Sequence, residues 1–296
     1  MLNLKKCALA AAVAYLGGLF CDEQQALKFI LVDRSVRMDP ATFDKTVLDG
    51  LIAQNKAIGA VQFDSAEDAN VDASFTDLST GERIQNNIGM KRWTFTFYKG
   101  NCFQNELHKL NKSERYGVMF VMEDGSILGQ LTKDGMLKGF DCKLFTGVKN
   151  IKTAAEGGGS TLMIDLTRTA MASWQGSSAV YESDEIDFLE LNPVAALDIK
   201  VPILVAAATT TVITVSNKCA DSVVTGLIDA DNWKMVDDGV VKAVTAVSEI
   251  TGEYTLTHPA LVATHKVYFK TFNAGYPVVS VDTNYYAGQS MEKTVV

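Results

Sequence analysis

The sequence has few of the residues from which catalytic and metal centres are usually built. It contains three histidines in 296 residues, His108, His258 and His265, and none has the H-x-x-x-H or H-E-x-x-H spacing of a zinc site. Its five cysteines include no C-x-x-C pair, so neither a zinc ribbon nor a redox dithiol is indicated. No G-x-S-x-G elbow occurs either. The expected site inventory is therefore empty: no catalytic residue, no metal, no cofactor and no enzymatic activity.

Long basic runs are also missing, since no run of Lys or Arg exceeds two residues. The formal net charge is −8 and the sequence pI is about 5.0, whereas a nucleic-acid footprint is a basic patch. We expect no sequence-specific binding of nucleic acid. Hydrophobic residues make up 47% of the chain and charged residues 21%, an ordinary globular composition with room for two domains.

The cysteines are odd in number and scattered along the chain: Cys7, Cys21, Cys102, Cys142 and Cys219. Without paired spacing, we expect reduced and partly buried thiols, as in a protein made in a cytosol. Folding is then expected to need no disulfide and no metal.

The first 24 residues predict an apolar N-terminal helix or arm. Lys5 and Lys6 precede an apolar stretch, residues 7–20, that resembles a secretory signal followed by Cys21. Phe20 is too large for the residue before a lipoprotein cysteine, and about 14 apolar residues are too few to span a bilayer. We expect this segment to pack against a neighbouring copy; a retained signal is the alternative.

Residues 25–195 predict an α+β domain with a mostly antiparallel sheet. Residues 91–99 alternate, with Trp93, Phe95 and Phe97 on one face, which indicates a strand with one face in the core. Asp-Gly turns at 123–126 and 133–135 predict a meander. Helices are expected from Asp39-Pro40 onward and at 101–111, and further strands at 27–32, 144–151, 160–166 and 186–191.

Residues 199–296 predict an all-β domain. Apolar, β-branched runs at 203–215, 223–228, 240–247, 253–257, 266–272 and 278–281 alternate with turn residues. About seven short strands at a spacing of roughly 8–12 residues are typical of an Ig-like β-sandwich. Within 266–272, Val267 and Phe269 are expected to point inward.

Three patterns could carry chemistry, and each has a simpler structural interpretation. The glycines at 157–159 lack the Lys and helix of a phosphate loop, so a flexible loop is expected. Trp93, Phe95 and Phe97 could stack bases or sugars, but aromatic residues at strand spacing more often form a core. The last pattern is an acidic cluster that could form a calcium site or a catalytic carboxylate pair. It lacks the glycine of a calcium loop, so a solvated sheet edge is expected. Its residues are Glu182, Asp184, Glu185, Asp187 and Glu190.

The stretch from residue 25 to 190 resembles virion proteins of tailed bacteriophages of Bacteroidetes-type hosts. The similar motifs are FILVDR at 29–34, KRWTFTFYKG at 91–100 followed by NCF, EDGSILG at 123–129 and KGF at 138–140. Residues 252–257 (GEYTLT) resemble the closing strands of bacterial and phage Ig-like domains. The resemblance implies a structural subunit of the tail tube, ring or neck, present in many copies.

The expected function is therefore a non-enzymatic virion subunit, made in the host cytoplasm, that self-assembles through its N-terminal domain and displays an Ig-like domain. Its expected partners are further copies of itself, in a ring or tube, and other virion proteins. No membrane span is expected. The alternative is a secreted or surface-attached binding or adhesion protein with a signal-like N-terminus.

Overall fold

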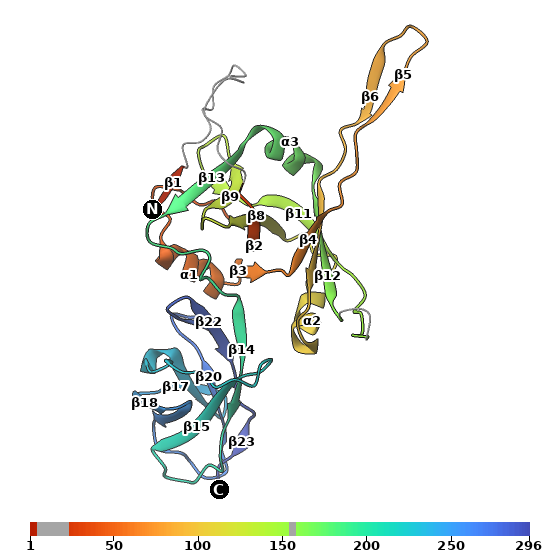
Figure 1. Cartoon of the computed structure of the whole chain (residues 1–296). Helices are drawn as coiled ribbons and strands as arrows, with labels where there is room; N and C mark the ends of the chain where they lie inside the picture. The colour runs from red at the N-terminus through yellow and green to blue at the C-terminus, as the bar shows by residue number, and fades with distance from the viewer. Residues whose placement is uncertain (5–23, 154–157) are drawn as a thin grey trace. The chain divides into compact units, whose positions relative to one another are not determined.

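Antiparallel β-structure dominates the computed structural model, which describes residues 1–4, 24–153 and 158–296 (Figure 1). Strands account for 47% of the structure and helices for 11%. The chain forms two compact units. The first unit comprises Met1–Leu48 and Lys56–Glu190, and the second comprises Asp49–Asn55 and Leu191–Val296. The division falls before Leu191, and β14 (Val194–Lys200) lies within the second unit.

The first unit is built on an eleven-stranded sheet system with order β1-β13-β9-β8-β11-β12-β7-β4, in which β2 pairs with β8 and β3, and β10 with β9. Its strands are β1 (Leu2–Leu4), β2 (Ala26–Asp33), β3 (Ala57–Gln62), β4 (Ser65–Asp68), β7 (Arg92–Phe97), β8 (Tyr116–Met122), β9 (Ile127–Leu131), β10 (Leu137–Lys138), β11 (Phe140–Thr146), β12 (Ser160–Leu166) and β13 (Ser178–Ser183).

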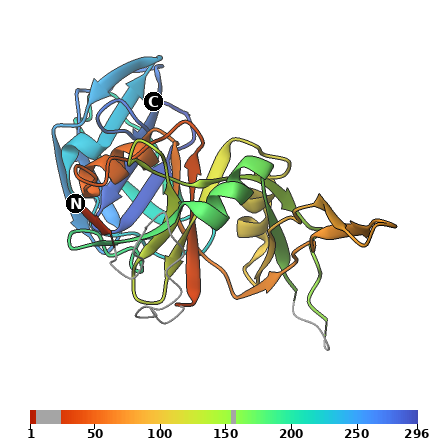
Figure 2. The same cartoon turned by 90° about the horizontal axis from the view of Figure 1, so that it is seen from above.

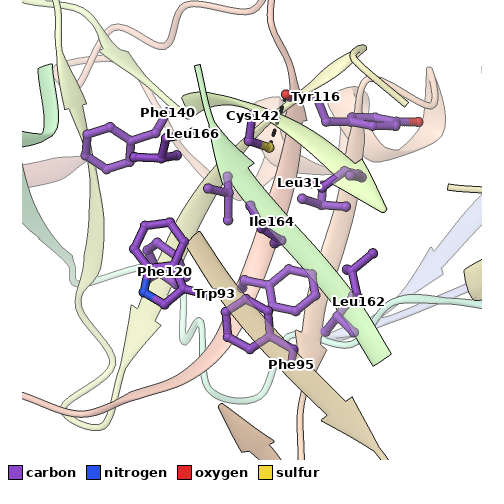
Figure 3. Packing of buried hydrophobic residues seen from close by; sticks show 14 of the residues in the cluster. Leu31, Trp93, Phe95, Tyr116, Phe120, Phe140, Cys142, Leu162, Ile164 and Leu166 are labelled. Atoms are coloured by element: carbon purple, nitrogen blue, oxygen red, sulfur yellow. Dashed lines mark hydrogen bonds between the residues drawn. The ribbon is translucent and has the colours of Figure 1, made fainter. Parts of the chain in front are cut away.

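The core of this unit follows from side-chain alternation along its strands. In β7, Trp93, Phe95 and Phe97 are 8%, 1% and 0% exposed, so the expected core face is confirmed. Leu162 and Ile164 of β12 are fully buried against them. Figure 3 shows Trp93, Phe95, Leu162 and Ile164 in one cluster with side chains of β8 and β11. Both expected Asp-Gly turns form, with Gly125 and Gly135 at positive φ, which glycine adopts without strain.

One chain segment passes from one part of the sheet system to another. Strand β3 pairs with β2, and β4, which begins three residues after β3 ends, pairs with β7. Beyond β4 the chain leaves the sheet as a hairpin made of β5 (Ser74–Asp77) and β6 (Arg83–Asn87), then returns to start β7. We call residues 69–90 the arm. In Figures 1 and 2 the arm extends away from the rest of the first unit.

Three α-helices occur among the described residues: α1 (Lys45–Ala53), α2 (Asn101–His108) and α3 (Arg168–Gly176). Helix α1 starts later than expected, because Asp39 caps a preceding turn through the N–H of Ala41, at 3.0 Å. Helix α3 was not expected. Thr167 caps it by accepting the N–H of Ala170 at 3.2 Å, and Ala170 and Met171 are buried.

The expected N-terminal helix within residues 1–24 falls mostly on residues 5–23, outside the described residues. Leu2–Leu4 instead form β1, which pairs with β13 through Leu2 and Ser183 and through Leu4 and Tyr181. The strand expected at 186–191 is absent from the described structure, where this stretch is a series of turns.

The second unit encloses its core between two sheets of order β18-β19-β15-β14-β22-β21 and β17-β16-β20-β23; all pairings are antiparallel except that of β14 with β22. Its strands are β14 (Val194–Lys200), β15 (Thr210–Asn217), β16 (Trp233–Asp237), β17 (Val240–Ala243), β18 (Ala246–Ile250), β19 (Glu253–Thr257), β20 (Lys266–Thr271), β21 (Val278–Val281), β22 (Asn284–Gly288) and β23 (Lys293–Thr294). A short 3-10 turn, η1 (Ala230–Asn232), precedes β16.

Large side chains from both sheets fill this core. Trp233 of β16, Tyr254 of β19 and Phe269 of β20 are fully buried. Val267 and Phe269 point inward as predicted. The strand expected at 203–215 starts only at Thr210, and the one expected at 223–228 is reduced to a single bridge between Ser216 and Val223.

Candidate functional site: an exposed arm and an aromatic cavity

The arm carries apolar side chains that its own unit leaves exposed. Phe75 is 49% exposed and Ile84 50%, and Leu78 and Ile88 are 37% and 48% exposed. Every residue of β5 is exposed. Internal contacts of the arm are local: Arg83 pairs with Asp77 at 2.9 Å, and its guanidinium lies over the Phe75 ring. A turn at 79–82 closes the hairpin, and the N–H of Leu78 donates to Glu82 O at 2.7 Å.

A cavity of about 720 Å³ lies in the first unit at the start of β2 and the corner between β3 and β4. Aromatic side chains line it, and the rings of Trp93 and Trp174 are 5.1 Å apart. Figure 3 shows three of the lining residues, Trp93, Phe95 and Phe120. The volume is within the range of ligand pockets, roughly 300–1,000 Å³. The described cavity can therefore accept an apolar side chain or a small apolar ligand.

Lys28 gives this cavity its cationic group. Burial lowers the pKa of Lys28, and the carboxylates of Glu190 and Asp187 partly oppose that change. Its ammonium donates a hydrogen bond to the carbonyl oxygen of Leu189. Because these acidic groups offset its charge, Lys28 is a polar anchor at an otherwise apolar wall and not a strong anion site.

A second group of polar side chains occurs in the second unit. Asp237 is 2% exposed. Its carboxylate accepts a hydrogen bond from Lys242 Nζ at 2.6 Å and lies 2.7 Å from His265 Nδ1. Asp237, Asp238 and His265 each place one possible metal-ligand atom within 4.8 Å of the other two. The ammonium group of Lys242 already neutralises the buried carboxylate of Asp237, so this carboxylate needs no metal ion to balance its charge. The sequence spacing did not predict it, because Asp237 and His265 meet only through the β16–β20 pairing.

The other two histidines have ordinary structural partners. His108, at the end of α2, lies 3.0 Å from Thr146 Oγ1. His258 is buried, with Nε2 at 2.8 Å from Thr211 Oγ1. Burial lowers the pKa of His258, which favours the neutral ring.

The remaining sequence patterns lie in separate places. All of the acidic side chains expected at a sheet edge are exposed or half-exposed, and Glu185 pairs with the N-terminal amine at 3.3 Å. Gly158 and Gly159 lead into β12, so a strand follows the glycine-rich loop and no helix N-terminus faces it. That arrangement does not form a phosphate loop.

The cysteines differ from the expectation of reduced thiols. Cys102 and Cys219 are each disulfide-bonded. Cys142 of β11 is a buried free thiol that donates to Tyr116 O at 3.4 Å, drawn as a dashed line in Figure 3. Scattered spacing was therefore a poor guide to oxidation state, because distant cysteines become neighbours only through folding.

Comparison of the chain with protein-family models and with curated proteins finds no match. Among the described residues, no helix combines the length and apolarity needed to cross a membrane.

Proposed function

We propose that this protein is a non-enzymatic structural subunit of a tailed-phage virion, in the tail tube, ring or neck region, which self-assembles through its first unit. The observation that carries the proposal is the arm, with its exposed Phe75, Leu78, Ile84 and Ile88. An isolated two-stranded hairpin is marginally stable in water, and exposed apolar groups of this kind mark interaction surfaces. A second copy that covers the arm would remove both costs.

Unpaired strand edges support the same proposal. Strand β3 pairs only with β2, and β4 pairs only with β7, so each has one edge without a partner strand among the described residues. Exposed edges of this kind pair readily with another chain. In addition, the motifs that resemble phage virion proteins lie in the first unit.

We further propose that the first unit is an α+β assembly domain and that the second is an Ig-like display domain. The two sheets of the second unit enclose a buried tryptophan, Trp233 of β16. The centroid of its ring lies 5.7 Å from that of Tyr254. The strand order supports this proposal: β18-β19-β15-β14-β22-β21 lies opposite β17-β16-β20-β23, and without β21 and β22 the order is that expected of an Ig-like sandwich. No catalytic constellation was found in either unit among the described residues.

Replacing residues 74–87 with a short Gly-Ser turn tests the assembly role. The wild-type chain should form a closed or tubular oligomer by sedimentation velocity and negative-stain electron microscopy, and the arm-less variant should be monomeric. A circular-dichroism spectrum and melting temperature close to wild type would show that the variant is folded. A wild-type chain that stays monomeric at high concentration contradicts the proposal.

The disulfide-bonded Cys102 and Cys219 favour a second candidate, a secreted or surface-attached binding protein. Disulfides persist mainly in oxidising compartments, and the aromatic cavity would then be the binding site. Fractionation of producing cells separates the two candidates. Export with a shortened N-terminus supports the secreted protein, whereas cytoplasmic particles that retain residue 1 support the virion subunit.

A further inference from the structure

The arm is acidic as well as apolar. Residues 69–90 contain three carboxylates, Asp72, Asp77 and Glu82, and one basic residue, Arg83. Arg83 pairs with Asp77 within the arm. In the described part of the chain, neither Asp72 nor Glu82 forms an ion pair, and both are exposed. The arm therefore presents unpaired negative charge beside Phe75 and Ile84.

A second protruding segment of the first unit has the opposite charge. We call residues 147–153, between β11 and β12, the basic loop; its sequence GVKNIKT contains two lysines and no acidic residue. Val148 is 87% exposed and Ile151 82%, the most exposed of the large apolar side chains in the first unit's described residues. Lys149 and Lys152 are exposed and make no ion pair among the described residues.

Backbone hydrogen bonds hold the base of the basic loop in place. The N–H of Gly147 donates to Thr161 O at 3.0 Å, and that of Asn150 donates to Gly159 O at 2.9 Å. The loop thus extends the β11–β12 hairpin beyond its last ladder pair. Its apolar and basic side chains are presented to solvent from a hydrogen-bonded base.

The arm and the basic loop leave the sheet at opposite ends. Strands β7 and β12 are paired from Arg92 and Asp165 at one end to Phe97 and Ser160 at the other. The arm joins β7 at the Arg92 end, and the basic loop joins β12 at the Ser160 end, as Figure 1 shows. Six residues of strand separate these ends by roughly 20 Å, and the two segments extend away from each other.

From this arrangement we propose that the arm of one copy docks on the basic loop of a second copy. Asp72 and Glu82 face Lys149 and Lys152 across the contact, while the apolar side chains of both segments cover each other. Because the two surfaces differ and lie at opposite ends, the contact is heterologous and joins copies head to tail. This inference rests on the proposed self-assembly and identifies the two surfaces that carry it.

Charge reversal tests the docking with three variants. Lys149→Glu/Lys152→Glu makes the loop acidic, and Asp72→Lys/Glu82→Lys makes the arm basic. Each variant alone presents like charges at the contact, so each should sediment as a monomer at low ionic strength. In an equimolar mixture, every arm finds a loop of opposite charge and assembly should return. Lys133→Glu/Lys218→Glu lies outside the contact, changes the net charge by the same amount as the loop variant and should assemble like wild type.

Circular dichroism on each variant confirms that a monomer is folded. Reversed variants that assemble as well as wild type, or a mixture that stays monomeric, overturn the docking while self-assembly stands. A monomeric wild-type chain overturns the proposed function, and the docking with it.

Discussion

The Nδ1 atom of His265 lies 2.7 Å from Oδ1 of Asp237, and Lys242 Nζ lies 2.6 Å from the other oxygen of the same carboxylate. Burial raises the pKa of Asp237, but the hydrogen bonds from Lys242 and His265 outweigh burial and leave it lowered. Asp237 lies on β16, the strand between β17 and β20. Its buried carboxylate therefore binds one side chain from β17, Lys242, and one from the residue directly before β20, His265.

Asp237→Asn should destabilise the protein by about 1–3 kcal/mol, because it removes a buried charge that two donors share. Asp238→Asn is the matched control. Asp238 is the next residue and is exposed, and Asn retains its acceptor for the N–H of Lys266, so a loss below about 0.5 kcal/mol is expected. Urea denaturation measures both; equal losses would contradict the assignment.

Asp33 should make stability depend on pH in the acid range. The side-chain hydrogen bond from Arg115, at 2.8 Å, is the main reason that the pKa of Asp33 is lowered from 3.8 to about 2. A carboxylate with a lowered pKa in the folded state contributes stability above its unfolded pKa, and this contribution is lost as pH falls through the folded value.

Asp33→Asn should therefore cost about 1 kcal/mol near pH 6, after allowance for solvent around the partly exposed Arg115. The difference from wild type should shrink as pH falls from about 4 to about 2. Unfolding free energies measured across this range test the sign; a difference that grows toward low pH would refute it.

Leu162 and Met163 are neighbours on β12 that point to opposite faces. Leu162 is fully buried in the core cluster, and Met163 is 36% exposed. Leu162→Ala should cost about 2–5 kcal/mol, since it leaves a cavity in a packed core. Met163→Ala should cost less than about 1 kcal/mol. Reversal of this order in chemical denaturation would mean that the register of β12 is wrong.

The Cys142 thiol should be inert in the folded protein. Burial is the main reason that its pKa is raised to about 12, so almost no thiolate forms near neutral pH. Iodoacetamide at about pH 8 should label Cys142 only after denaturation. Peptide mapping by mass spectrometry locates the label, and rapid native labelling at this position would show that β11 is exposed.

Local patterns predicted the strands whose side chains alternate. Trp93, Phe95 and Phe97 define β7 without reference to anything distant, and the Asp-Gly turns place β8, β9 and β10. Helix α3 escaped prediction because its residues have little apolar periodicity; its stability comes from the Thr167 cap and from packing of Trp174 against Trp93.

The candidate sites were less predictable because they depend on distant segments. The polar and acidic composition of residues 65–85 indicates a long loop or a weak hairpin, but no local pattern indicates that the hairpin projects from the sheet. The cavity combines β2, β7, β8 and α3, and Asp237 meets His265 across 28 residues of sequence. Contacts between residues far apart in the sequence depend on the order in which strands pair, and local hydrophobic periodicity does not predict that order.

The attachment of the arm also determines how the first unit carries mechanical load. Both ends of the arm continue into neighbouring strands, β4 and β7, so a pull on the arm draws these two strands in the same direction. The pull is resisted by the β7–β12 ladder, whose six residue pairs from Arg92 to Phe97 are loaded in shear. Bonds loaded in shear share the force and must fail together, whereas a peeled strand loses them one at a time. The attachment of the arm should therefore resist a pulling force until all six β7–β12 residue pairs separate together.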